Sequence, residues 1–155
     1  RTHYFMKGVE GKFHLFVTKS PGVESGYMMA HVTASALVSE NKTLAHPASV
    51  DSLPTSGGQE DVVSMAPWAG QKLLQIQHNL RHILAVELLV AGAANQIASP
   101  NLTPGKGTLP ILNILKSLCK YQNGDRTLSE EIELIAKKIK CGEFVHAVTK
   151  NIILE

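Results

Sequence analysis

The residues with the clearest chemical potential lie in one polar loop, residues 46–65. Gly57-Gly58 is followed there by the triplet Gln59-Glu60-Asp61, directly before a long apolar stretch. If a helix starts at this triplet, its free N–H groups and dipole stabilise the charge of Glu60, and the glycines let the backbone pass close to a ligand. Glu60 would then hold a cationic or imidazole-bearing substrate. The same spacing also fits an ordinary helix cap that includes Ser56, and spacing alone favours the cap.

Three other patterns are weaker candidates. His78 and His82 have the spacing of a metal-binding pair, but Asn79 stands where the zinc-protease pattern needs glutamate, so we expect a solvated helix face and no metal. Residues 104–108, Pro-Gly-Lys-Gly-Thr, lack the first glycine of a phosphate-binding loop and the strand before it, which indicates a turn. Glu87 lies within an apolar run, and a buried carboxylate needs a partner, which we expect on another helix or subunit.

The composition excludes several classes of partner. The chain has 155 residues, 44% of them hydrophobic and 18% charged, which suits one globular domain. A net charge of +2 with scattered lysines gives no basic stripe for nucleic acid. The longest nearly apolar run, residues 83–94, is too short to span a bilayer, and no signal peptide is recognisable. Cys119 and Cys141 form neither a disulfide framework nor a zinc motif, so we expect a cytoplasmic protein that binds no membrane.

Helical spacing of the apolar residues, without a useful strand pattern, predicts an all-α fold. Residues 1–19 are expected to form an extended or loop-like lead-in. The expected helices cover residues 21–41 (starting at Ser20-Pro21), 61–96, 109–121 and 143–153, with a further helix that opens at the capping-box pattern Thr127-Leu128-Ser129-Glu130. We divide the chain into 1–98, with the lead-in, a helix, the site loop and the long helix, and 99–155, a C-terminal helical segment of the same domain.

The long helix is too large for a chain of this size. About 35 residues at ~1.5 Å rise give ~50 Å, whereas a globule of this length is roughly 40 Å across. Residues 83–94 are apolar on every side, so other helices must surround them, and too little chain remains here to do so. The sequence also opens on Arg1 without an initiator methionine. We therefore expect the chain to be a piece of a longer protein.

Two stretches resemble the aromatic amino acid ammonia-lyases, and the histidine ammonia-lyases in particular. They are PGVESGYMMAHVTASALVSENKTLAHPASVDSLPTSGGQEDVVSM, from Pro21, and RHILAVELLVAGA, in the long helix. The resemblance implies the C-terminal third of such an enzyme, a long-helix bundle that is part of the L-aspartase/fumarase-like lyase fold. The fumarases and aspartases themselves carry a different, serine-containing signature loop, which is absent here.

The resemblance also implies a division of the chemistry. These lyases use a methylidene-imidazolone cofactor, formed from an internal Ala-Ser-Gly, and no metal; this sequence contains no such triplet. The cofactor, the tyrosine base and the carboxylate-binding arginine would therefore come from an N-terminal part that is missing here. The implied reaction is elimination of ammonia from the small-molecule substrate L-histidine to give urocanate. Without the missing part, this chain would be inactive.

Glu60 falls where the histidine-specific members carry glutamate and the phenylalanine- and tyrosine-specific members carry glutamine. A carboxylate can accept a hydrogen bond from an imidazole N–H or from a substrate ammonium. The resemblance thus implies Glu60 as a catalytic residue, with Glu60 and Gln59 as substrate-binding residues. The family's usual Ala-Asn is replaced by Gly57-Gly58, and its usual histidine by Val62, so tyrosine or phenylalanine stays open as substrate.

The resemblance further implies a homotetramer whose central bundle contains the 61–96 helix. The alternative is a non-catalytic helical interaction module that kept the lyase scaffold, with Gly58 and Val62 as signs of drift.

Overall fold

The computed structural model describes residues 1–155 except 10–13, 99–102, 122–123, 151 and 153–155. The described residues form helices and no strand, with two isolated backbone bridges. The elements are α1 (Thr2–Met6), η1 (Leu15–Val17), α2 (Met28–Leu44), η2 (Ala48–Val50), η3 (Ser56–Gly58), α3 (Ala66–Ala98), α4 (Thr108–Leu118), α5 (Ser129–Lys140) and α6 (Glu143–Thr149). The predicted all-α fold is confirmed.

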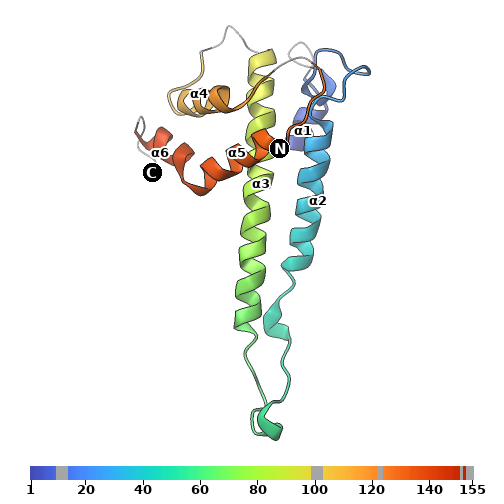
Figure 1. Cartoon of the computed structure of the whole chain (residues 1–155), viewed down its shortest axis with the longest axis vertical. Helices are drawn as coiled ribbons and strands as arrows, with labels where there is room; N and C mark the ends of the chain where they lie inside the picture. Colours follow the sequence, from blue (N-terminus) through green and yellow to red (C-terminus); the bar gives the residue numbers. More distant parts are fainter. Residues whose placement is uncertain (10–13, 99–102, 122–123, 151, 153–155) are drawn as a thin grey trace.

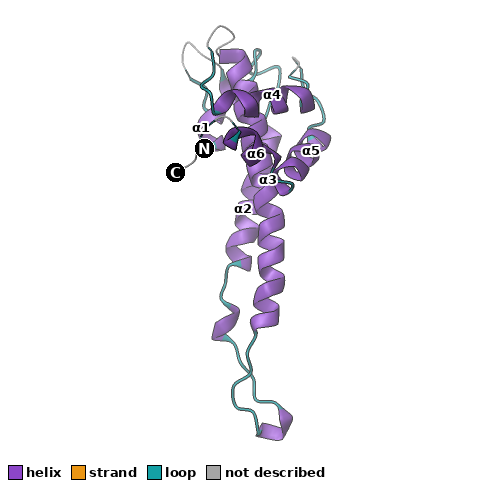
Figure 2. Ribbon diagram, turned by 90° about the vertical axis from the view of Figure 1, so that its left-hand side faces the viewer, coloured by secondary structure: helices purple, strands orange, loops and turns teal. Residues whose placement is uncertain are grey.

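Two long helices form the axis of the structure. α2 and α3 run side by side in opposite directions, and residues 45–65 connect them at the end farthest from the other helices (Figures 1 and 2). α4, α5 and α6 lie beside the C-terminal half of α3 (Figure 1). With 33 residues, α3 is about 50 Å long, as predicted. The molecule therefore consists of a helical body and a projecting arm. The body contains the C-terminal half of α3 with the helices around it, and the arm is the loop of residues 45–65, called the site loop below, with the adjoining parts of α2 and α3.

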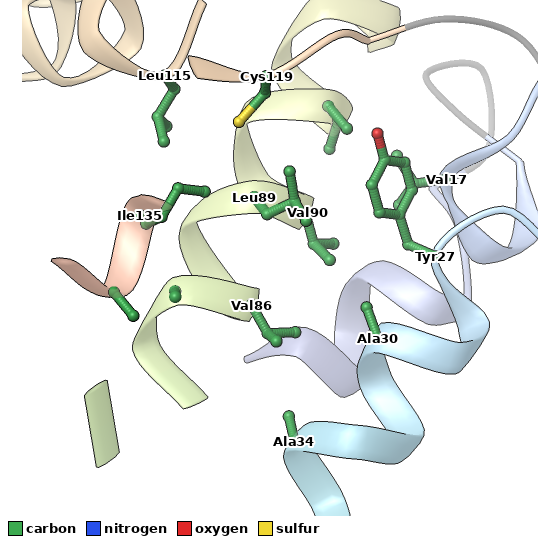
Figure 3. Packing of buried hydrophobic residues seen from close by; sticks show 14 of the residues in the cluster. Val17, Tyr27, Ala30, Ala34, Val86, Leu89, Val90, Leu115, Cys119 and Ile135 are labelled. Carbon is green, nitrogen blue, oxygen red and sulfur yellow. The ribbon is translucent and has the colours of Figure 1, made fainter. Parts of the chain in front are cut away.

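The hydrophobic core surrounds the C-terminal half of α3 (Figure 3). Ala30 and Ala34 of α2 are buried, and their small side chains let α2 approach α3 closely. Burying one large aliphatic side chain contributes roughly 1.5–3 kcal/mol, and several are buried completely or almost completely here. These are Val86, Leu89, Val90, Leu115 and Ile135, each at most 1% exposed.

The rest of α3 is much less covered. Trp68, Leu73, Leu74 and Leu80 are each 46–67% exposed, and Leu84 within the apolar run is 39% exposed. None of the helices described here is long and apolar enough to cross a membrane. The chain therefore buries the C-terminal half of α3 and leaves apolar side chains of its N-terminal half exposed to solvent.

The N-terminal expectations need two corrections. The lead-in is not wholly extended or loop-like, because Thr2–Met6 forms α1. α2 begins at Met28, since Ser20-Pro21 enters a turn in which Gly22 has a φ of +91°. Gly26 approaches Phe16 so closely that an added Cβ would lie 2.5 Å from the Phe16 carbonyl oxygen. This loop, rather than the proline, determines where the helix starts.

The other helix boundaries also differ from the predictions. α3 begins at Ala66 instead of 61, so Pro67 falls in the first turn, where its missing N–H removes no helical hydrogen bond. The capping box does not form, because Leu128 is the N-cap of α5 and no side chain caps it. α4 ends at Leu118 and α6 at Thr149. The predicted end of the last helix, residue 153, and the linker residues 99–102 lie outside the described residues.

Candidate functional site

The site loop is a hairpin-like turn held at two levels. Near its base, Ser52 Oγ donates a hydrogen bond to the Val63 carbonyl oxygen at 3.2 Å and accepts one from the Val63 N–H at 2.9 Å. Near its tip, Thr55 and Glu60 form an antiparallel bridge. The loop therefore has defined geometry although it projects from the helical body (Figure 1).

Three consecutive residues make the turn at the tip. Ser56, Gly57 and Gly58 have φ values of +56°, +69° and +86°. Glycine adopts this left-handed region without the steric cost that other residues have. A Cβ at Gly57 or Gly58 would meet nothing within 4 Å. In this chain the two glycines are therefore needed for the backbone conformation, and not for space.

Glu60 lies in the segment of the loop that follows this turn. Its side chain is exposed, and its carboxylate oxygen Oε2 accepts a hydrogen bond from Thr55 Oγ1 at 3.1 Å. The prediction that the dipole of the long helix stabilises Glu60 is wrong, because Glu60 precedes the first residue of α3, Ala66, by more than a helical turn. Gln59 is also exposed, beside Glu60. The loop thus presents a carboxylate and an amide outward.

The cavities of the helical body do not include these two side chains. A cavity of about 640 Å³ lies between α2, α3 and α5, and one of about 100 Å³ is lined by residues such as Tyr27, Tyr121 and Arg126. A third, of about 230 Å³, is lined partly by Glu87 and Phe144. Gln59 and Glu60 line none of the three. In the described part of the chain, the predicted site is an open surface.

The other predicted candidates are paired within the chain. His82 Nε2 lies 3.0 Å from Glu133 Oε1 of α5, and the His78 and His82 rings are 4.5 Å apart. The described residues contain no group of three or more side chains that could hold a metal ion. Glu87 pairs with Arg1 at 3.1 Å, so this chain itself supplies a partner, from the residue that precedes α1. These residues connect the helices of the body.

A polar cluster that the sequence did not reveal lies beside the core. Arg126 Nη2 is 2.7 Å from Glu131 Oε2, and the Arg126 guanidinium lies 5.8 Å from the centre of the Tyr27 ring. Burial raises the pKa of Tyr27 and also that of Tyr121. Burial likewise raises the pKa of the Cys119 thiol to about 11. Tyr27 is far in the sequence from Arg126, so no local spacing could have indicated that these two side chains meet.

Asp125 fixes the loop that precedes α2. Its carboxylate accepts hydrogen bonds from the backbone N–H groups of Ser25 at 3.0 Å and Gly26 at 2.9 Å. These two bonds lower the pKa of the carboxyl group. The contact joins residues about 100 positions apart, so the segment before α5 helps to place the start of α2.

Comparisons with known proteins agree on one family. The family model for aromatic amino acid lyase matches residues 1–117. The histidine ammonia-lyase of Burkholderia cenocepacia is 50% identical over 124 residues, which is 80% of this chain and 24% of that protein.

Two crystal structures resemble the chain closely. Histidine ammonia-lyase from Trypanosoma cruzi has a TM-score of 0.85 at 34% identity and covers 91% of this chain, matching 28% of its own. Tyrosine aminomutase from Streptomyces globisporus also has a TM-score of 0.85, at 32% identity, over 94% of this chain and 27% of its own. The chain therefore has the fold of the corresponding part of these enzymes, and it spans about a quarter of the length of the proteins it matches.

Proposed function

This chain belongs to the aromatic amino acid lyase family, and from that premise we propose that it supplies part of the active site of a histidine ammonia-lyase. The observation that supports this most directly is the outward-facing Glu60 carboxylate on a turn with fixed geometry. The parent reaction would be elimination of ammonia from L-histidine to give urocanate.

Glu60 would bind the substrate through a charge-assisted hydrogen bond. A carboxylate accepts from the imidazole N–H or from the ammonium group of histidine, and such bonds are about twice as strong as neutral ones. Its oxygen Oε2 is bound to Thr55, so Oε1 is the atom that would meet the substrate. Gln59, with one acceptor oxygen and an NH₂ group, would add a second polar contact from the same turn. A carboxylate in this position would also exchange a proton with the bound substrate.

The pocket would be completed by polypeptide outside this chain. Gln59 and Glu60 line none of the three cavities described above, and an exposed carboxylate gives weak binding because water competes for it. We propose that the rest of the enzyme covers the loop and excludes water from Glu60.

The family's methylidene-imidazolone does not fit the residues of this chain. The sequence has no Ala-Ser-Gly from which that group forms, and the side chains at the loop tip, Gln59 and Glu60, are too exposed to enclose it. Its electrophilic chemistry would belong to the rest of the enzyme, so the role proposed for this chain is to bind and orient the substrate.

The exposed apolar side chains of the arm support assembly of several copies. Trp68, Leu73 and Leu74 lie on the first half of α3, where the described chain leaves them 54–67% exposed. Several large apolar side chains that one segment leaves exposed are typical of an interaction surface. We propose a cytoplasmic homotetramer in which the arms pack together and cover these residues.

The proposal can be tested with an enzyme in which this chain is joined to the preceding portion of the Burkholderia cenocepacia relative. Urocanate formation, followed by absorbance, should appear with the joined enzyme and not with this chain alone. Replacing Glu60 by alanine should lower kcat/KM for histidine about 10- to 150-fold, since a hydrogen bond to a charged group contributes about 1.5–3 kcal/mol. The unchanged relative is the control. Turnover by the isolated chain, or full turnover by the Glu60→Ala enzyme, would contradict the proposal.

The open surface around Glu60 also suits a second function, that of a non-catalytic helical interaction module on a lyase scaffold. A module would give a folded joined protein without turnover, and the Glu60 substitution would then change no rate.

A further inference from the structure

The tip of the site loop connects the same two residues by three hydrogen bonds. The Thr55 N–H donates to the Glu60 carbonyl oxygen at 3.0 Å, and the Glu60 N–H donates to the Thr55 carbonyl oxygen at 3.3 Å. The third bond is between side chains, from Thr55 Oγ1 to Glu60 Oε2 at 3.1 Å. Directly paired residues of antiparallel segments project their side chains to the same face. The backbone bonds therefore bring the hydroxyl and the carboxylate together.

The surrounding loop keeps this pair in register. The turn between the two residues is tight, and the Gly58 N–H donates to the Thr55 carbonyl oxygen at 3.0 Å. On the other side, the two hydrogen bonds between Ser52 and Val63 hold the base of the loop. A pair fixed on both sides cannot shift by one residue without breaking these bonds, and such a shift would turn Glu60 to the opposite face.

The hydroxyl of Thr55 restricts the side chain that binds the substrate. A free glutamate side chain samples many rotamers, and fixing them on binding weakens the affinity for a ligand. Among the residues that the structure describes, Thr55 Oγ1 is the donor to the Glu60 carboxylate, and Oε1 has no partner. One oxygen is thus held and the other is free to accept.

We propose that Thr55 is a positioning residue for Glu60. Its hydroxyl holds Oε2 and so presents Oε1 to a substrate N–H, while Thr55 itself does not touch the substrate. This inference rests on the proposed function, in which Glu60 binds the substrate.

The experiment uses the joined enzyme with Thr55→Val, which keeps the shape but removes the hydroxyl, and Thr55→Ser, which keeps the hydroxyl. Thr55→Val should lower kcat/KM for histidine about tenfold, and Thr55→Ser should stay close to the unmodified enzyme. The same Thr55→Val substitution is then made in the Glu60→Ala enzyme, where it should cause no further loss. A threonine that only stabilises the loop would cause the same loss in both backgrounds, which would overturn the proposal.

The two hypotheses fail differently. If Glu60→Ala lowers turnover but Thr55→Val does not, Thr55 has no positioning role, whereas the function proposed for Glu60 stands. If Glu60→Ala changes nothing, the function proposed for Glu60 fails.

A second measurement does not depend on activity. In the full 155-residue chain, nuclear magnetic resonance relaxation reports the mobility of the Glu60 side chain. It should be restricted in the unmodified and Thr55→Ser chains and more mobile with Thr55→Val. Equal mobility in all three chains would overturn the inference.

Discussion

Gly92 of α3 packs tightly against Tyr121, so a substitution at Gly92 sets helix propensity against steric overlap. A Cβ added to Gly92 would lie 2.2 Å from the Tyr121 hydroxyl oxygen, 3.0 Å from its Cζ and 3.3 Å from Leu115 Cδ1. Tyr121 follows α4 and lies beyond the residues that match the family model. Gly92→Ala therefore tests whether this later segment packs on α3 as the structure shows.

The expected size of the effect follows from helix propensity and steric overlap. Alanine is more favourable than glycine in a helix interior by about 1 kcal/mol. An extra methyl group in a tightly packed place costs about 1–3 kcal/mol. Because 2.2 Å is far inside van der Waals contact, we expect the overlap to dominate and Gly92→Ala to lower the free energy of unfolding by about 1 kcal/mol.

The matched control is Tyr121→Phe, which removes the hydroxyl group that the alanine Cβ at position 92 would overlap. This hydroxyl is buried, and the Cys119 thiol, a weak hydrogen-bonding group, is the polar side chain that interacts with it. Removal of the hydroxyl alone should therefore change the stability by less than about 1 kcal/mol. In the Tyr121→Phe background, Gly92→Ala should be close to neutral, because the remaining Cζ contact needs a shift of only a few tenths of an ångström.

Urea unfolding of the four chains, followed by circular dichroism, measures the coupling between the two positions. We expect a coupling free energy of about 1 kcal/mol, the difference between the two effects of Gly92→Ala. If Gly92→Ala has the same effect with tyrosine and with phenylalanine at position 121, Tyr121 does not pack on Gly92, and the described placement of this segment is wrong.

Two further predictions concern titratable groups in the same part of the chain. Cys141 is exposed, whereas Cys119 is buried and its thiol pKa is raised to about 11, so one thiol should react with Ellman's reagent in the folded chain and both after unfolding; rapid reaction of both in the folded chain would contradict the burial of Cys119. The backbone N–H groups of Ser25 and Gly26 lower the pKa of Asp125, so this carboxylate stabilises the fold at neutral pH and loses that contribution as the pH falls through its folded-state pKa. Asp125→Asn should therefore reduce the dependence of unfolding free energy on pH in the acidic range, and an unchanged dependence would show that the two backbone bonds do not form.

The sequence predicted the long elements well, because their signal extends over many residues. Helical recurrence of apolar residues along α3 outweighs the local effect of Gly70, whereas Pro67 lies in the first turn, where it removes no helical hydrogen bond. The boundaries were less predictable because they depend on local contacts. The start of α2 is an example, since it follows from the approach of Gly26 to the Phe16 carbonyl oxygen, and Ser20-Pro21 has the sequence of a helix start without being one.

The candidate site was only partly predictable. The residue types of Gln59 and Glu60 indicated substrate binding through the family resemblance, and that role stays a prediction. The local geometry predicted for these two residues was wrong, because we expected a helix start where the structure has a turn. A Gly57-Gly58 pair between two polar segments is typical of a hairpin turn, and this pattern could have indicated the pairing of Thr55 with Glu60. Contacts such as Asp125 with Ser25 and Gly26 join distant segments and leave no local signal.

We propose above that the Glu60 carboxylate recognises histidine. The most direct measurement is the ratio of kcat/KM for histidine to kcat/KM for phenylalanine, compared between the joined enzyme and its Glu60→Gln variant. Glutamine keeps the size of the side chain but removes the charge, and an apolar phenyl ring offers no hydrogen bond to a carboxylate. We predict that the ratio falls at least tenfold, through loss of turnover on histidine. An unchanged ratio, in an enzyme that still forms urocanate, would contradict the role assigned to Glu60.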